Sequence, residues 1–142
     1  MTLEGGCLCG AVRYRVEGTP LDAGYCHCRV CQRSAGAPVL AWFTVTSQAF
    51  GWSSPPPATF RSSAHGSREF CSKCGTQLLF KEDGVDLVDV NLATLDDPTL
   101  VRPDYHIWTQ SRIPWFEIAD DLPRHPDGGP DRELSQRHRG GP

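Results

Sequence analysis

Cys26-His27-Cys28-Arg29-Val30-Cys31 is the densest of three short clusters that together hold all seven cysteines of the chain. The other two are Cys7-Leu8-Cys9-Gly10 and Cys71-Ser72-Lys73-Cys74-Gly75. A C-x-x-C turn brings two sulfurs to one point, and a C-x-C pair on extended backbone places both sulfurs on one face. Zn²⁺ takes such sulfurs at the corners of a tetrahedron, with Zn–S distances of ~2.3 Å. The spacing therefore predicts that the cysteines are metal ligands and not disulfide partners.

Seven ligands divide most naturally into a group of four and a group of three. Four cysteines close a structural zinc site, whereas three leave one coordination position for water or substrate. The spacing alone leaves the partition open, because Cys28 and Cys31 could instead form a site with Cys71 and Cys74. Cys7, Cys9 and Cys26 would then be left outside that site. We favour Cys26, Cys28 and Cys31 as the three-ligand site, since three donors within six consecutive residues form a tripod without outside help.

The residues beside the clusters fit this prediction. Gly10 and Gly75 directly follow cysteines, where a tight turn next to a metal needs a positive φ. His27 stands between two expected ligands, and on extended backbone its side chain points to the opposite face. This favours a supporting role next to the zinc ligands, or contact with substrate, over zinc coordination by His27 itself. Three basic residues near the clusters are either surface charges or compensate the thiolates: Arg29, Arg33 and Lys73.

The composition is that of an ordinary soluble domain. A chain of 142 residues fits one domain that can bury a core without disulfides. It has no apolar run near the roughly 18 to 20 residues that cross a bilayer, and no secretion signal at its N-terminus. We expect a cytoplasmic location, where clustered cysteines bind metal more often than they pair. The formal charge of -3, made more negative by thiolates, argues against nucleic-acid binding.

The hydrophobic pattern predicts a mostly β fold without a long helix. Residues 11–16 alternate strictly, with Val12, Tyr14 and Val16 on one face, and residues 39–45 form the continuous apolar run of a strand buried on both faces. Further elements are expected as a hairpin of 77–80 and 85–92, late strands at 105–108 and 115–118, and a short helical turn at 96–100.

The chain divides into one zinc-binding domain, residues 1–122, and a C-terminal tail, residues 123–142. The tail contains one large apolar residue, Leu134, among proline, glycine and charged residues. Such a segment buries too little surface to offset its ordering entropy, so we predict that it is flexible.

Five motifs together resemble the glutathione-dependent formaldehyde-activating enzyme family, and the similarity spans about residues 4 to 122. The combination is specific, whereas a single C-x-x-C would not be. The motifs are Gly6-Cys7-Leu8-Cys9-Gly10, Cys26-His27-Cys28-Arg29-Val30-Cys31, Arg68-Glu69-Phe70-Cys71-Ser72-Lys73-Cys74-Gly75, Tyr105-His106-Ile107-Trp108 and Pro114-Trp115-Phe116-Glu117-Ile118.

The resemblance implies an Mss4-like fold of several small coiled β-sheets organised around zinc, with two Zn²⁺ per chain. It implies carbon–sulfur bond formation and cleavage, in which glutathione as co-substrate and formaldehyde give S-hydroxymethylglutathione and the reverse. The partners would be a small-molecule thiol and an aldehyde. The resemblance assigns the structural zinc to Cys7, Cys9, Cys71 and Cys74, and the catalytic zinc to Cys26, Cys28 and Cys31.

Two other functions compete with this one. A non-catalytic, zinc-stabilised binding module of the same fold would not need an open metal site. A methionine sulfoxide reductase would need a redox-active cysteine outside the zinc ligands, and no cysteine follows Cys74. His106, Trp108 and Trp115 either line a substrate pocket or pack in the core. A homodimer is compatible with the sequence.

Overall fold

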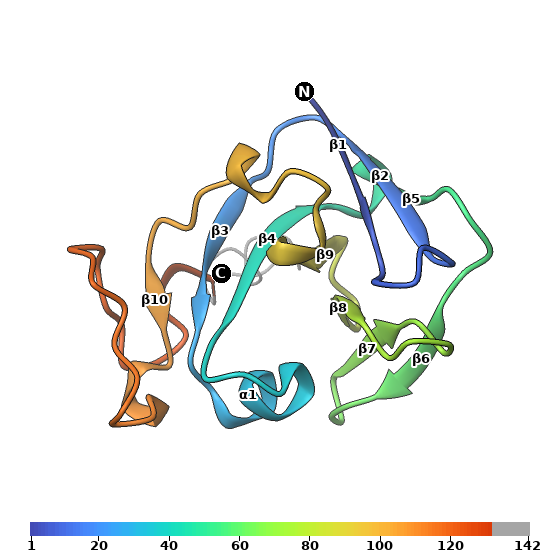
Figure 1. Cartoon of the computed structure of the whole chain (residues 1–142). Coiled ribbons are helices and arrows are strands. Elements are labelled where there is room, and N and C mark those ends of the chain that lie inside the picture. Colours follow the sequence, from blue (N-terminus) through green and yellow to red (C-terminus); the bar gives the residue numbers. More distant parts are fainter. Residues whose placement is uncertain (132–142) are drawn as a thin grey trace.

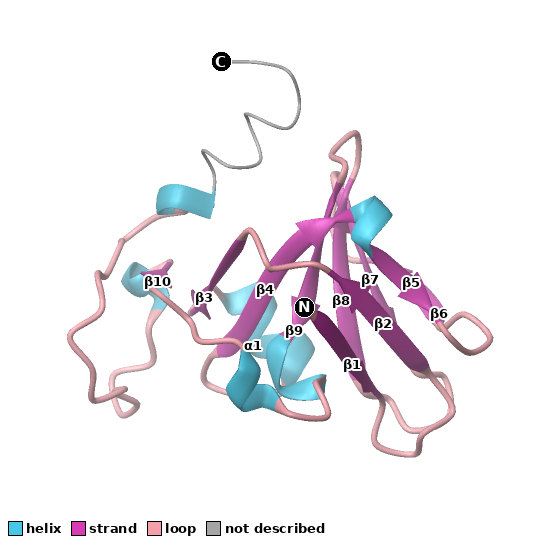
Figure 2. Cartoon of the chain, turned by 90° about the horizontal axis from the view of Figure 1, so that it is seen from above, coloured by secondary structure: helices cyan, strands magenta, loops and turns pink. Residues whose placement is uncertain are grey.

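The computed structural model describes residues 1–131, which form mainly β-strands; one short α-helix lies between the strands, and residues 129–131 are also helical (Figures 1 and 2). The helix, α1 (Arg29–Ala35), follows the third strand. Four 3₁₀ turns lie within this part of the chain, at Ser47–Ala49, Leu92–Thr94, Pro98–Leu100 and Thr109–Ser111. The strands are β1 (Thr2–Gly6), β2 (Arg13–Glu17), β3 (Asp22–Cys26), β4 (Leu40–Thr46), β5 (Phe50–Trp52), β6 (Ala58–Arg61), β7 (Gly66–Phe70), β8 (Gln77–Glu82), β9 (Leu87–Asn91) and β10 (His106–Ile107).

The strands form two sheets. A three-stranded antiparallel sheet has the order β1-β2-β5, and a seven-stranded sheet has the order β10-β3-β4-β9-β8-β7-β6. Every pair in the larger sheet is antiparallel except β10 and β3, which run parallel. The small sheet and β10 lie at opposite ends of the molecule (Figures 1 and 2). The predicted mainly β fold is confirmed.

The core follows the predicted hydrophobic pattern. Val12, Tyr14 and Val16 are buried as expected, and the Tyr14 ring stacks on Phe50 with centroids 5.3 Å apart. In β4, which pairs with β3 on one side and β9 on the other, the consecutive residues 42–45 are all buried, so both faces of the strand are covered. Alternation therefore marks the strand with one buried face, and the continuous run marks the central strand.

The elements later in the chain agree with the sequence predictions in part. Strands β8 and β9 form the predicted hairpin, and Gly84 in its turn has φ +72. The predicted helical turn is present at Pro98–Leu100, where the Asp97 carboxylate accepts from Thr99 N–H at 3.1 Å. The predicted strand at 115–118 is wrong. Its carbonyls are satisfied locally instead, since the Arg112 and Arg124 side chains donate to Phe116 and Ile118.

Backbone hydrogen bonds hold residues 123–127 along the outer edge of β10. His106 N–H donates to Pro123 O and His125 N–H donates to His106 O, both at 2.9 Å, and Trp108 N–H donates to Asp127 O. The part of the predicted tail that the structure describes thus pairs with an edge strand, although its composition is polar. Residues 132–142 lie outside the described residues, so the boundary at residue 122 remains a prediction. Among residues 1–131, no helix combines the length and apolar character that a membrane span needs.

Candidate metal centres

The first group of cysteines lies where the two sheets meet. Cys7 and Cys9 follow β1, and Cys71 and Cys74 lie between β7 and β8. All four sulfurs lie within 4.8 Å of one another, with Cys7 Sγ 3.6 Å from Cys9 Sγ and Cys9 Sγ 3.8 Å from Cys71 Sγ. Sulfurs at ~2.3 Å from a tetrahedral Zn²⁺ stand about 3.8 Å apart. The four side chains therefore fit a closed zinc site.

Both turns of this group point backbone N–H groups at sulfur. Cys7 Sγ accepts from Val12 N–H at 3.2 Å, and Cys71 Sγ accepts from Cys74 N–H at 3.5 Å. Gly10 and Gly75 close the turns with φ of +82 and +80, as predicted from their positions. The backbone thus stabilises negative charge on the sulfurs and fixes where they point.

The second group forms a tripod at the junction of β3 and α1. Cys26 ends β3, Cys28 is the N-cap of α1, and Cys31 lies in the first turn, where its N–H donates to Cys28 Sγ at 3.3 Å. The three sulfurs lie within 4.8 Å of one another, and no fourth His, Cys, Asp or Glu among the described residues joins them. The structure thus brings the cysteines together in the groups of four and three that we favoured from the sequence.

The three neighbouring thiols shift one another's pKa values. Hydrogen bonds from the Cys26 and Cys31 thiols lower the pKa of Cys28, and the hydrogen bond with Cys28 raises the pKa of Cys26. A divalent cation would replace these shared protons, which is the chemistry of a thiolate metal site. Arg68 Nη2 lies 3.8 Å from Cys31 Sγ and adds positive charge beside the tripod.

A cavity of about 220 Å³ opens beside the tripod and is bounded on several sides by apolar side chains. Trp108 lines it from a left-handed backbone conformation (φ 55), a strained state for a non-glycine residue of the kind that concentrates at functional sites. The lining residues are Cys26, Cys28, Cys31, Leu40, Trp42, Arg68, Phe80, Asp89, Asn91, Ile107, Trp108 and Asp131.

Two carboxyl groups in this cavity are poised to hold protons near neutral pH. Burial raises the pKa of Asp89 to about 6, even though Thr44 Oγ1 donates to its Oδ1 at 2.6 Å. Burial, together with the charges of Asp89 and Asp22, raises the pKa of Asp131 to about 8. The cavity thus combines three thiols, one guanidinium and acids able to exchange a proton.

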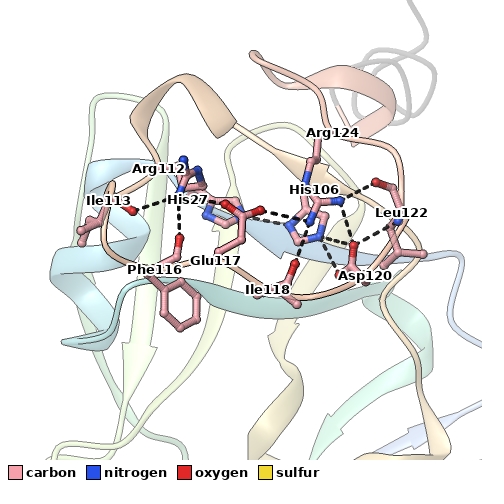
Figure 3. A network of polar contacts seen from close by, with 10 residues as sticks. All are labelled: His27, His106, Arg112, Ile113, Phe116, Glu117, Ile118, Asp120, Leu122 and Arg124. Carbon is pink, nitrogen blue, oxygen red and sulfur yellow. Dashed lines mark hydrogen bonds and ion pairs between the residues drawn. The ribbon is translucent and has the colours of Figure 1, made fainter.

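His27 points away from the tripod, as predicted, into a different buried network (Figure 3). Its Nε2 lies 2.9 Å from His106 Nδ1, and His106 Nε2 lies 2.9 Å from Asp120 Oδ2. Burial opposes ionisation of Asp120, but hydrogen bonds from His106, Leu122 N–H and Arg124 outweigh it and lower its pKa. Glu117 forms ion pairs with Arg112 and Arg124 in the same network. The network fixes the ring that stands between two candidate ligands.

The three aromatic residues singled out in the sequence therefore lie in three different surroundings. Trp108 lines the cavity at the tripod, whereas His106 lines the cavity of the His27 network, which has a volume of about 310 Å³. Trp115 is 75% exposed and lines neither of these two cavities.

Sequence reasoning missed Arg68, Asp89 and Asp120. Asp89 had a usable signal, since it is the one acid in the apolar stretch from Leu87 to Val90. Arg68 lies on β7, 37 positions from Cys31 in the sequence, so spacing held no clue to it.

Comparison with known proteins supports one family. A protein-family model described as "Glutathione-dependent formaldehyde-activating enzyme" matches residues 2–111. A protein of Halomonas elongata, whose name assigns it provisionally to the same enzymes, is 31% identical over 150 aligned positions, covering 97% of this chain and 95% of its own. A crystal structure of a Rhodobacter sphaeroides protein matches with a TM-score of 0.58 at 21% identity, over 85% of this chain and 98% of that one. The last likeness shows a shared fold.

Proposed function

The chain belongs to the family of glutathione-dependent formaldehyde-activating enzymes, and we propose that it catalyses the reversible addition of glutathione to formaldehyde at the Cys26–Cys28–Cys31 tripod. The sulfur–carbon bond forms while the carbonyl π bond opens, and the thiol proton ends on the former carbonyl oxygen. The product is S-hydroxymethylglutathione, and the reverse reaction returns the proton to sulfur. No oxidant or reductant is needed.

The observation that carries this proposal is a three-cysteine tripod that lines a cavity instead of being closed by a fourth ligand. Zn²⁺ held by three cysteines would supply positive charge that lowers the pKa of an entering thiol and polarises a carbonyl. A non-catalytic binding module has no need of such a cavity at its second cluster. The four-cysteine group, which fits a closed site, is assigned to a structural zinc.

The protein's own side chains have distinct tasks in this proposal. Trp42, Ile107 and Trp108 form apolar walls that exclude water and hold the aldehyde close to the sulfur. Arg68, whose Nη2 lies 3.8 Å from Cys31 Sγ, would offset the negative charge of the thiolates.

Proton transfer is assigned to Asp89. Its Oδ1 is held by Thr44, so its Oδ2 is the atom that accepts the thiol proton and returns it to the product oxygen. A carboxyl group with a pKa of about 6 is present in both protonation states near neutral pH, as a general acid–base needs. We also propose a reducing, cytoplasmic setting, which keeps all seven cysteines unpaired.

Two-dimensional exchange NMR tests the proposal directly. Glutathione and ¹³C-formaldehyde are mixed until the adduct is at equilibrium, and the exchange rate is measured with and without zinc-loaded protein. We expect the protein to raise the rate well above that of the buffer. An unchanged rate, with glutathione and with other small thiols, would reject the enzymatic function.

A further inference from the structure

A second, larger groove of about 790 Å³ lies between α1 and the strands β6 and β7, which occupy the same end of the molecule (Figure 1). Its lining combines two arginines, hydroxyl and amide groups, and apolar side chains, with no acidic residue. Phe60 in this lining is 57% exposed. The lining residues are Val30, Arg33, Ser34, Thr59, Phe60, Ser62, Arg68, Phe70 and Gln77.

The groove adjoins the cavity at the tripod. Arg68 lines both spaces, with its guanidinium 4.9 Å from the centre of the Phe80 ring and its Nη2 3.8 Å from Cys31 Sγ. Helix α1 likewise contributes to both, since Cys31 faces the tripod cavity while Val30 and Arg33 line the groove. The two spaces are therefore neighbours that share Arg68 in their walls.

The two arginines of the groove, like Arg29 and Arg102, form no ion pair with a carboxylate among the described residues. Arg68 Nε is also buried without a hydrogen-bond acceptor. A buried donor without a partner is costly, and an anionic ligand would remove that cost. The arginines that do form ion pairs are Arg13, Arg15, Arg61, Arg112 and Arg124.

We propose that this groove binds the carboxylate-bearing body of the thiol substrate, with Arg33 and Arg68 pairing with its carboxylates. The inference rests on the proposed function, because it places the rest of the same substrate. Thr59, Ser62 and Gln77 offer partners for peptide groups of that body. The groove thus selects an acidic peptide thiol such as glutathione over small neutral thiols.

The test separates recognition of the body from chemistry at sulfur. S-methylglutathione has both carboxylates but no thiol, so calorimetric titration of the zinc-loaded protein measures its binding without any reaction. We expect Arg33→Gln to weaken its binding about tenfold, the loss of one charge-assisted contact. Its diethyl ester, which lacks both carboxylates, should bind the wild type more weakly than the diacid binds Arg33→Gln. Arg102→Gln is the matched control, since Arg102 is exposed and lines neither space.

Equal affinity of diacid and diester for the wild type, or an Arg33→Gln protein that binds like Arg102→Gln, would overturn the groove assignment even if exchange catalysis is observed. Conversely, diacid binding that depends on Arg33 in a protein that catalyses no exchange would leave the groove assignment standing and reject the proposed reaction. Arg33 is exposed on α1, so its replacement does not disturb the core.

Discussion

Cys9 Sγ and Cys71 Sγ lie 3.8 Å apart, although 62 positions separate the two residues in the sequence. One follows β1 in the small sheet and the other follows β7 in the large sheet. The four-cysteine group therefore ties the two sheets together, while the tripod is built from one short segment of chain.

This difference predicts the metal content. Protein purified with added zinc should contain about two Zn²⁺ per chain, one in each group. Mild chelation should remove the tripod ion first, because three ligands hold a metal less completely than four. Elemental analysis together with circular dichroism checks this. A content that never exceeds one ion would contradict the two-site assignment.

Serine substitutions should distinguish the structural role of the four-cysteine group from the role of the tripod. Cys74→Ser should unfold or precipitate the protein, because a structural zinc contributes its binding free energy to folding. Cys28→Ser should shift the melting temperature by only a few degrees, since serine keeps the N-cap acceptor that Cys31 N–H uses. Thermal melting of both variants in zinc-containing buffer makes the comparison. Equal loss of fold would mean that the tripod is structural.

Asp89→Asn should make the protein more stable and less active. The folded-state pKa of Asp89, about 6, lies above its usual 3.8, so stability falls as the pH rises from about 4 through 6. Asparagine cannot ionise, and its oxygen still accepts from Thr44. The stability gain over wild type should therefore grow from pH 5 to pH 8 and reach up to about 3 kcal/mol, as measured by urea denaturation.

The activity of the same variant separates catalysis from stability. Loss of a general acid–base should slow exchange by about 100-fold or more. The charged groups near Asp89 are Asp22, Asp131 and Arg68, and the variant leaves all three in place. Full activity in Asp89→Asn would remove Asp89 from the reaction.

Asp120→Asn should destabilise the protein at neutral pH, because the carboxylate accepts from the buried His106 ring and from Arg124. The neighbouring Asp121 is exposed, so Asp121→Asn should change the free energy of unfolding by less than about 0.5 kcal/mol. Urea denaturation of both variants tests the difference. Equal effects would mean that the histidine network contributes nothing specific.

The cysteine spacing predicted which residues meet, because C-x-C and C-x-x-C segments fix local geometry. It did not predict α1, since a seven-residue helix with one buried residue, Gln32, leaves no periodic stripe. Arg68 and Asp120 reach their sites through strand pairing and through the irregular segment after β10, and neither has a local signature. A strand was likewise predicted at 115–118, where arginine side chains satisfy the backbone carbonyls instead.

The exchange rate between free glutathione and S-hydroxymethylglutathione, measured by NMR with zinc-loaded wild type and Cys28→Ser side by side, tests the central claim most directly. We predict strong acceleration by the wild type and a rate equal to that of the buffer with Cys28→Ser, while the circular dichroism of the two proteins is the same. A folded Cys28→Ser protein that accelerates exchange as well as the wild type would show that the tripod is not the reactive centre.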